Sequence, residues 1–291
     1  MQIKCFLSNC IINLKEPMIL NIDGFEINLV QNEDFDFYKR QQYKNKWIEA
    51  TTLIFDEIEE KEIPKVKEIA QNISELLSFA TLSPVRFFRI YKDNSFFYES
   101  HGKNGTYNSF RFPIDIQNEY DIKEFLESCY DLYRKKRDGR QLNVVIEYLV
   151  SSETLKIPME LKLATIFILL ENLKKTYANE EGYPFINGSY KHKIKCVEKN
   201  KEKHIVINFK ELLFRMLKTF EINFDLKNII KLRNEIIHSG LSQTTFEKQN
   251  EIYYSCHDLV HEYILKLLNY KGSYLVFSKR SNVKTKTSPS K

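Results

Sequence analysis

Three side chains in the segment KLRNEIIHSG (residues 231–240) are of the types needed to cleave a phosphodiester bond. An Arg guanidinium offers a fixed fork of donors that matches phosphate oxygens, and a His takes or gives a proton near neutral pH. Arg233 and His238 supply these groups, and Asn234 could orient the imidazole or donate to a phosphate oxygen. A ribose 2′-OH could serve as the nucleophile, so we expect a reaction restricted to RNA that needs no metal ion or other cofactor.

A helix would position these residues. Asn234 and His238 are four residues apart and share one helical face, whereas Arg233 and His238 lie about 140° apart around the axis. Asp225 is a candidate N-cap, and Gly240 is a candidate left-handed residue that ends the helix. A structural alternative stays open, because a His at a helix C-terminus favours the helix dipole and an Arg commonly pairs with a carboxylate.

Apolar spacing predicts further helices from about residue 117 onward. The predicted helical segments are 119–139, 141–152, 158–182, 208–220, 225–240 and 246–272. The segment 158–182 is apolar on most faces, which predicts a central helix. Residues 178–208 are rich in Gly, Pro and Lys and are expected to form a loop.

The first 116 residues have a different pattern. Short apolar runs and an Asp23-Gly24 turn predict strands within 3–60, a helix follows over 61–84, and strand-like aromatic patterning returns over 85–116. We therefore expect an α+β fold class. It comprises a strand-rich α+β domain over 1–116, a helical domain over 117–272 and a basic, disordered tail over 273–291.

The motif and its context resemble the HEPN superfamily, whose hallmark is Arg, a polar residue and then His near the end of a late helix. Arg233, Asn234 and His238 match that pattern, and Glu171 and Lys175 match a Glu-x-x-x-Lys pair that HEPN domains often carry on an earlier helix. The layout is similar to the ApeA-like branch, in which a strand-rich domain precedes the HEPN domain. The resemblance covers residues 117–272 best and extends to residues 1–116 only in their general α+β character.

The resemblance implies a homodimer that brings two Arg/His motifs into one composite active site. It also implies metal-independent endoribonuclease activity that leaves a 2′,3′-cyclic phosphate, in an antiviral defence or toxin effector. Glu171 and Lys175 would support the cleft, and an antitoxin or a trigger ligand could control it. The alternative is a non-catalytic HEPN module that binds RNA or a protein partner.

Composition is compatible with these expectations. The formal charge of +5 suits a nucleic-acid partner without requiring one. Five cysteines without paired spacing predict reduced thiols, and no apolar run is long enough for a bilayer, so we expect a cytoplasmic protein with no membrane partner.

Three other features leave alternatives open. His257 and His261 have the spacing of two zinc ligands, but no third ligand follows, so a place beside the bundle is the simpler interpretation. The basic runs 133–140 and 191–204 could be solvated surface or could guide RNA. In the second case Tyr183, Phe185 and Tyr190 would be available to stack on bases.

Overall fold

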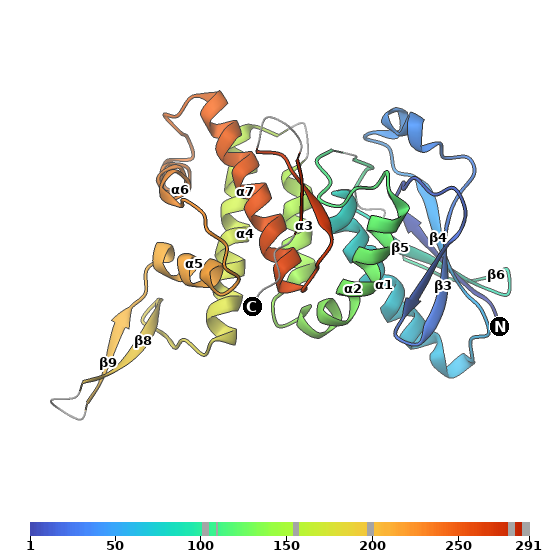
Figure 1. The fold of residues 1–291 in the computed structure, drawn as a ribbon, viewed down its shortest axis with the longest axis horizontal. Helices are drawn as coiled ribbons and strands as arrows, with labels where there is room; N and C mark the ends of the chain where they lie inside the picture. The colour runs from blue at the N-terminus through green and yellow to red at the C-terminus, as the bar shows by residue number, and fades with distance from the viewer. Residues whose placement is uncertain (101–104, 109, 154–156, 197–200, 279–282, 287–291) are drawn as a thin grey trace.

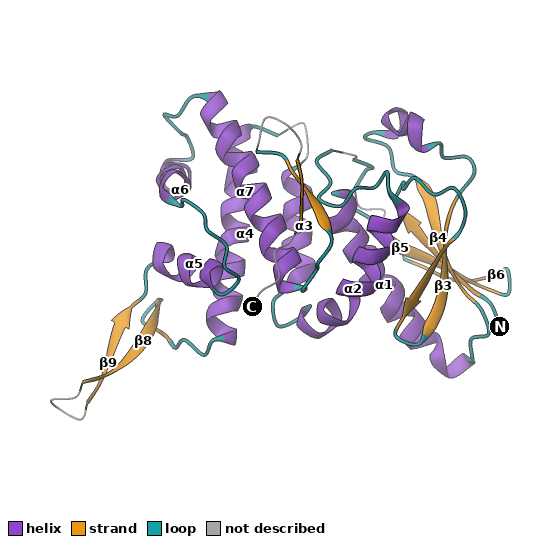
Figure 2. Ribbon diagram, viewed as in Figure 1, coloured by secondary structure: helices purple, strands orange, loops and turns teal. Residues whose placement is uncertain are grey.

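The computed structural model describes residues 1–100, 105–108, 110–153, 157–196, 201–278 and 283–286. An antiparallel sheet lies at one end, helices make up the other end, and α1 to α3 lie between them (Figures 1 and 2). This arrangement confirms the predicted α+β class.

The sheet contains six strands in the order β2-β3-β4-β1-β5-β6, all paired antiparallel. Their bounds are Ile3–Ser8 (β1), Met18–Ile22 (β2), Phe25–Gln31 (β3), Glu49–Phe55 (β4), Arg86–Lys92 (β5) and Ser95–Glu99 (β6). Asp23 and Gly24 both have positive φ and join β2 to β3 in a two-residue hairpin, as their types predict. Two short 3₁₀ segments, Phe37–Tyr43 and Glu60–Glu62, lie in the connections.

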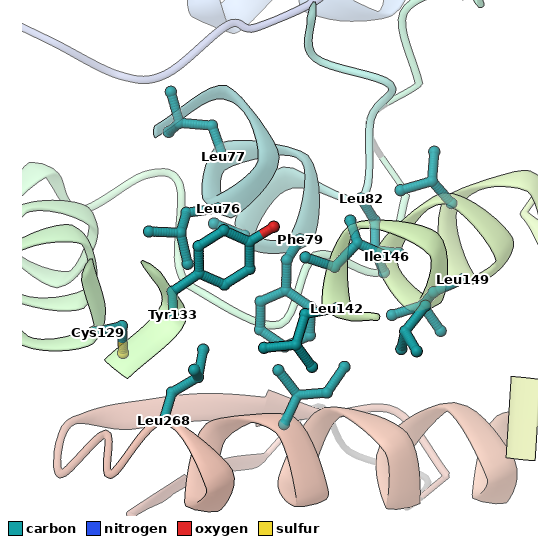
Figure 3. Close-up of a cluster of buried hydrophobic side chains, with 14 of the residues drawn as sticks. Leu76, Leu77, Phe79, Leu82, Cys129, Tyr133, Leu142, Ile146, Leu149 and Leu268 are labelled. Atoms are coloured by element: carbon teal, nitrogen blue, oxygen red, sulfur yellow. The ribbon is translucent and has the colours of Figure 1, made fainter. Parts of the chain in front are cut away.

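Helix α1 (Ile63–Thr81) joins the sheet to the helical part. It contacts β1 and β5 on one side and α2 (Glu119–Lys136) and α3 (Leu142–Ser152) on the other. Figure 3 shows the side chains of these three helices meeting, with Leu268 closing the cluster. Phe79 stacks on Phe125 at 5.8 Å between ring centroids. The hydrophobic core is therefore continuous across residue 116, where the sequence suggests a domain boundary.

The remaining helices surround α4 (Met159–Glu180). Helix α4 contacts α3, α5 (Phe209–Lys218), α6 (Lys227–Ser239) and α7 (Phe246–Leu267), which confirms the prediction of a central helix. Because α4 contacts four other helices, a side chain on it can meet residues that are distant in the sequence.

The segment 178–208 differs from the expected loop. It contains β7 (Phe185–Ile186), β8 (Ser189–Cys196) and β9 (Lys201–Val206), and the β8–β9 hairpin projects from the helical part (Figure 1). Asn187 and Gly188 have positive φ and form the turn between β7 and β8. The prediction failed because the abundant lysines concealed a period-two alternation with apolar residues and His.

Two further expectations are wrong in part. Among the described residues of 105–118 there is no strand; Arg111 has a positive φ and Pro113 lacks an N–H for a ladder. Conversely, residues 273–278 are not a disordered tail, because β10 (Ser273–Val276) pairs with β11 (Val283–Lys286) and its Tyr274 and Val276 are buried. The rest of that predicted tail, 279–282 and 287–291, lies outside the described residues.

The basic run 133–140 is used mainly for internal ion pairs. Arg137 holds Glu75 of α1, and Arg140 is buried against Glu180 of α4. The Arg137 guanidinium and other hydrogen bonds outweigh burial and lower the pKa of Glu75. These contacts favour a structural role for this run over RNA guidance.

A buried polar network lies where α3 meets α7. Glu153 accepts hydrogen bonds from Arg111 and Tyr253, and its Oε1 lies 3.2 Å from His257 Nε2. His261 is fully buried beside His257 and packs edge-on against Phe79. Burial and the positive charge of Arg111 lower the pKa of His261 to about 3, and burial lowers that of His257.

We expect the free energy of unfolding to fall as the pH drops below about 6.5, the pKa of an unfolded His. Between that pH and about 3 the unfolded chain binds a proton at His261 that the folded chain does not. The neutral His261 therefore contributes its full share of the folding stability only above about pH 6.5. The raised pKa of Glu153 opposes this trend, so the wild type alone is not diagnostic. His261→Leu should lose about 2 kcal/mol less stability than the wild type between pH 7 and pH 5. Urea unfolding at both pH values measures the difference, and equal losses would contradict the prediction.

Candidate functional site

Helix α6 carries the motif residues and ends at Gly240 as the sequence predicts, whereas its N-cap is Leu226 and not Asp225. Asp225 accepts a hydrogen bond from the backbone N–H of Lys227, and Gly240 adopts φ 73° and donates its N–H to the carbonyl of Ile236. Ile229, Leu232 and Ile236 form the buried face of the helix. The polar residues between them are therefore directed to other faces.

Arg233 is the best anchored of the motif residues. Its Nη2 donates to Oε1 of Glu171 on α4 at 2.8 Å, and its Nη1 donates to Oδ1 of Asn234 at 3.0 Å. The guanidinium carbon lies 4.9 Å from the centre of the Phe209 ring on α5. Three helices thus determine where this cation lies.

Glu171 has a different lysine partner from the one that its spacing suggests. Its second oxygen pairs with Lys174, whose ammonium lies 4.8 Å from the centre of the Phe209 ring. Lys175 is exposed and forms no ion pair within the described part of the chain. Neither Lys174 nor Phe209 was predicted from the sequence: Lys174 stands next to Lys175 in the pattern, whereas nothing local links Phe209 to Arg233.

His238 lies apart from this cluster. It is exposed in the last turn of α6, and its side chain forms no hydrogen bond or ion pair with the residues that the structure describes. Asn234 is also exposed and accepts from Arg233 rather than from the imidazole. The structure therefore brings Arg233, Asn234 and Glu171 together and leaves His238 open to a substrate or to a second chain.

A cavity of about 860 Å³ opens beside the Arg233–Glu171 pair. Its walls come from α3, α4, the β7–β9 segment and the start of α5, and include both Glu171 and Phe209. Aromatic and aliphatic side chains share the lining with Lys174 and Lys175. Phe185 and Tyr190, proposed from the sequence as stacking residues, line this cavity, whereas Tyr183 accepts a hydrogen bond from Arg215.

Exposed apolar side chains flank His238. Ile237 precedes it, and Leu241 and Phe246 follow between α6 and the first turn of α7, with 44%, 71% and 62% of their surfaces exposed. These three side chains are close in the sequence, and exposed apolar side chains that lie together are typical of surfaces that another protein covers.

The described residues offer no cluster of three or more His, Cys, Asp or Glu side chains suited to a metal ion. His257 and His261, considered from the sequence as zinc ligands, are buried, and His257 is within hydrogen-bonding distance of Ser152 and Glu153. Within the part of the chain that the structure describes, both nitrogens of His261 lack a hydrogen-bond partner.

In the described part of the chain, no helix combines the length and apolar character needed to cross a membrane. Comparison of the chain with protein-family models, with curated proteins and with solved structures gave no match.

Proposed function

We propose that the protein is a metal-independent endoribonuclease of the HEPN type. The observation that carries this proposal is the anchored guanidinium of Arg233, which is held by Glu171 and Phe209. Arg233 lies on the same helix as the exposed His238. A fixed cation and a free imidazole are the two groups that cleavage by a ribose 2′-OH requires.

In the proposed reaction His238 takes the proton of the 2′-OH, and the 2′-oxygen attacks phosphorus. The bond from phosphorus to the 5′-oxygen breaks, and the leaving oxygen takes a proton. The products are a 2′,3′-cyclic phosphate and a free 5′-OH, so no water is consumed.

Arg233 stabilises the extra negative charge on the phosphorane-like transition state. Among the described residues its Nη1 donates only to Asn234, a neutral and exposed side chain, so a phosphate oxygen can replace that contact. The bond from Nη2 to Glu171 holds the guanidinium in place meanwhile. Glu171 therefore positions Arg233, and the hydrogen bond from Arg233 to Asn234 is exchanged for one to the substrate phosphate.

A homodimer would complete the site. A second copy seated on Ile237, Leu241 and Phe246 would cover this apolar surface and bring a second His238 near the first. One imidazole would then act as the base and the other as the acid, which a single exposed His cannot do at once.

The N-terminal domain and an outside partner would control the nuclease. In a defence or toxin effector the sheet domain would sense a trigger, recruit RNA or restrain the helical part. The continuous core around Phe79 and Phe125 offers a physical link between the two parts.

One observation favours the alternative of a non-catalytic module that binds RNA or a protein. Glu171 already neutralises the charge of Arg233 in an ion pair. His238 makes no hydrogen bond with Arg233 or Asn234. A chain that only binds its partner needs no closer approach of these groups.

Purified protein should cleave total cellular RNA in the presence of EDTA. His238→Ala and Arg233→Ala should each lower the rate at least ~100-fold, because general acid–base catalysis and charge stabilisation are each worth about that much or more. Gel analysis of the three proteins at equal concentration measures this. Equal cleavage by all three would contradict the proposal, and binding without cleavage by the wild type would favour the non-catalytic module.

Leu241→Asp should convert a dimer to a monomer and abolish most cleavage, because the carboxylate would be buried without a partner. Ile19→Asp is the matched control, since Ile19 is 45% exposed on β2 of the sheet domain. Light scattering and the RNA assay report both properties. A wild-type monomer with full activity, or a Leu241→Asp dimer, would contradict the proposed composite site.

A further inference from the structure

We propose that the cavity between α4 and the β7–β9 segment binds one unpaired nucleotide of the RNA strand, next to the scissile phosphate. The position relative to the scissile bond rests on the proposed ribonuclease function, whereas the nucleotide chemistry rests on the cavity itself. Its volume of about 860 Å³ falls within the range of small-molecule sites and accommodates a base, a ribose and a phosphate.

The lining indicates a flat, apolar-faced ligand. Phe185, Ile168 and Val206 come from three different elements, all line the cavity, and each remains 49–62% exposed. The Phe185 ring lies 4.9 Å from the centre of the Tyr190 ring, whose hydroxyl is fixed by Asn179. This edge-type contact holds the Phe185 ring, and 62% of the residue remains exposed and available to stack on a base.

The charges indicate that the ligand is an anion. Lys174 and Lys175 line the cavity, and Glu171 is the one carboxylate among the described lining residues. Glu171 is already paired with Lys174 and Arg233, so its charge is compensated. The ammonium of Lys175 remains exposed and can neutralise a phosphate.

A hydrogen-bonding group is also available for a base edge. The Asn179 side-chain carbonyl accepts from Tyr190, which leaves the amide NH₂ of this exposed residue to donate. A stacking ring, an amide donor and an ammonium in one cavity are the groups that recognise an unstacked nucleotide.

Two lining residues connect this cavity to the motif. Glu171 and Phe209 line the cavity and also hold the guanidinium of Arg233. A base seated in the cavity would therefore place its adjoining phosphate close to Arg233. The same geometry favours single-stranded RNA, because a paired base cannot leave its helix without the cost of unstacking.

The test is the binding of a fluorescent 12-nucleotide single-stranded RNA to the full-length His238→Ala protein, which keeps the cavity and removes the proposed base. Phe185→Ala and Lys175→Gln should each weaken RNA binding. Loss of the stacking of one base on Phe185 should lower the affinity of Phe185→Ala by about 5- to 100-fold. Phe214→Ala and Lys210→Gln are the matched controls: Phe214 is 55% exposed on α5, Lys210 is exposed on α5, and neither lines the cavity. Phe185→Tyr keeps a stacking ring and should restore affinity, which separates stacking from a damaged hairpin.

Unchanged binding by both Phe185→Ala and Lys175→Gln, as with the control variants, would overturn the inference, whether or not the wild type cleaves RNA. Conversely, if the wild type does not cleave RNA but the Phe185 and Lys175 variants lose binding as expected, the ribonuclease proposal fails and the nucleotide site stands. Adenosine monophosphate and a fully paired RNA are the remaining arms. If free adenosine monophosphate competes at the same concentration as the oligonucleotide, the site does not require a nucleotide within a strand. If Phe185→Ala weakens the binding of paired RNA as much as that of single-stranded RNA, the site does not require an unpaired nucleotide.

Discussion

The contact between Arg233 and Glu171 is the constraint on which the proposed site depends. It joins α6 to the central helix α4 and sets the guanidinium beside the Phe209 ring. The Arg233 side chain is largely buried, so removal of Glu171 would leave a poorly solvated charge. The same carboxylate also limits how much of the charge reaches a phosphate. The pair therefore positions the cation, and a substrate phosphate must compete with Glu171 for the charge of Arg233.

The rest of the fold holds that pair at the edge of two surfaces. Glu171 lines the cavity together with Lys175 and Phe185, and Arg233 lies on the same helix as the exposed Ile237 and His238. We propose the first for a nucleotide and the second for another copy of the chain. Because α4 also packs against α3, and α3 against α1, one continuous core joins the six-stranded sheet to the helix that carries Glu171.

Local periodicity was enough to predict the α+β class and the central helix α4, since both depend on neighbours within a few turns. Gly240 marked the end of α6 correctly, whereas the N-cap fell at Leu226, one residue after the predicted Asp225. Residue type singled out Arg233, and the resemblance to the HEPN superfamily singled out Glu171, although their contact could not be derived from spacing. Phe209 was missed because it meets Arg233 only through tertiary packing. The β8–β9 hairpin was mistaken for a loop because its lysines dominate the composition, and β10 was hidden in a polar tail whose Tyr274 is buried.

The most direct test of the account is cleavage, in EDTA, of one RNA oligonucleotide and of copies in which single riboses are replaced by 2′-deoxyribose. If the substrate supplies the nucleophile, each replacement should abolish the cut on the 3′ side of that residue alone, and every product should carry a 2′,3′-cyclic phosphate. Cleavage that persists beside a 2′-deoxyribose, or products that carry a 5′-phosphate, would contradict the account.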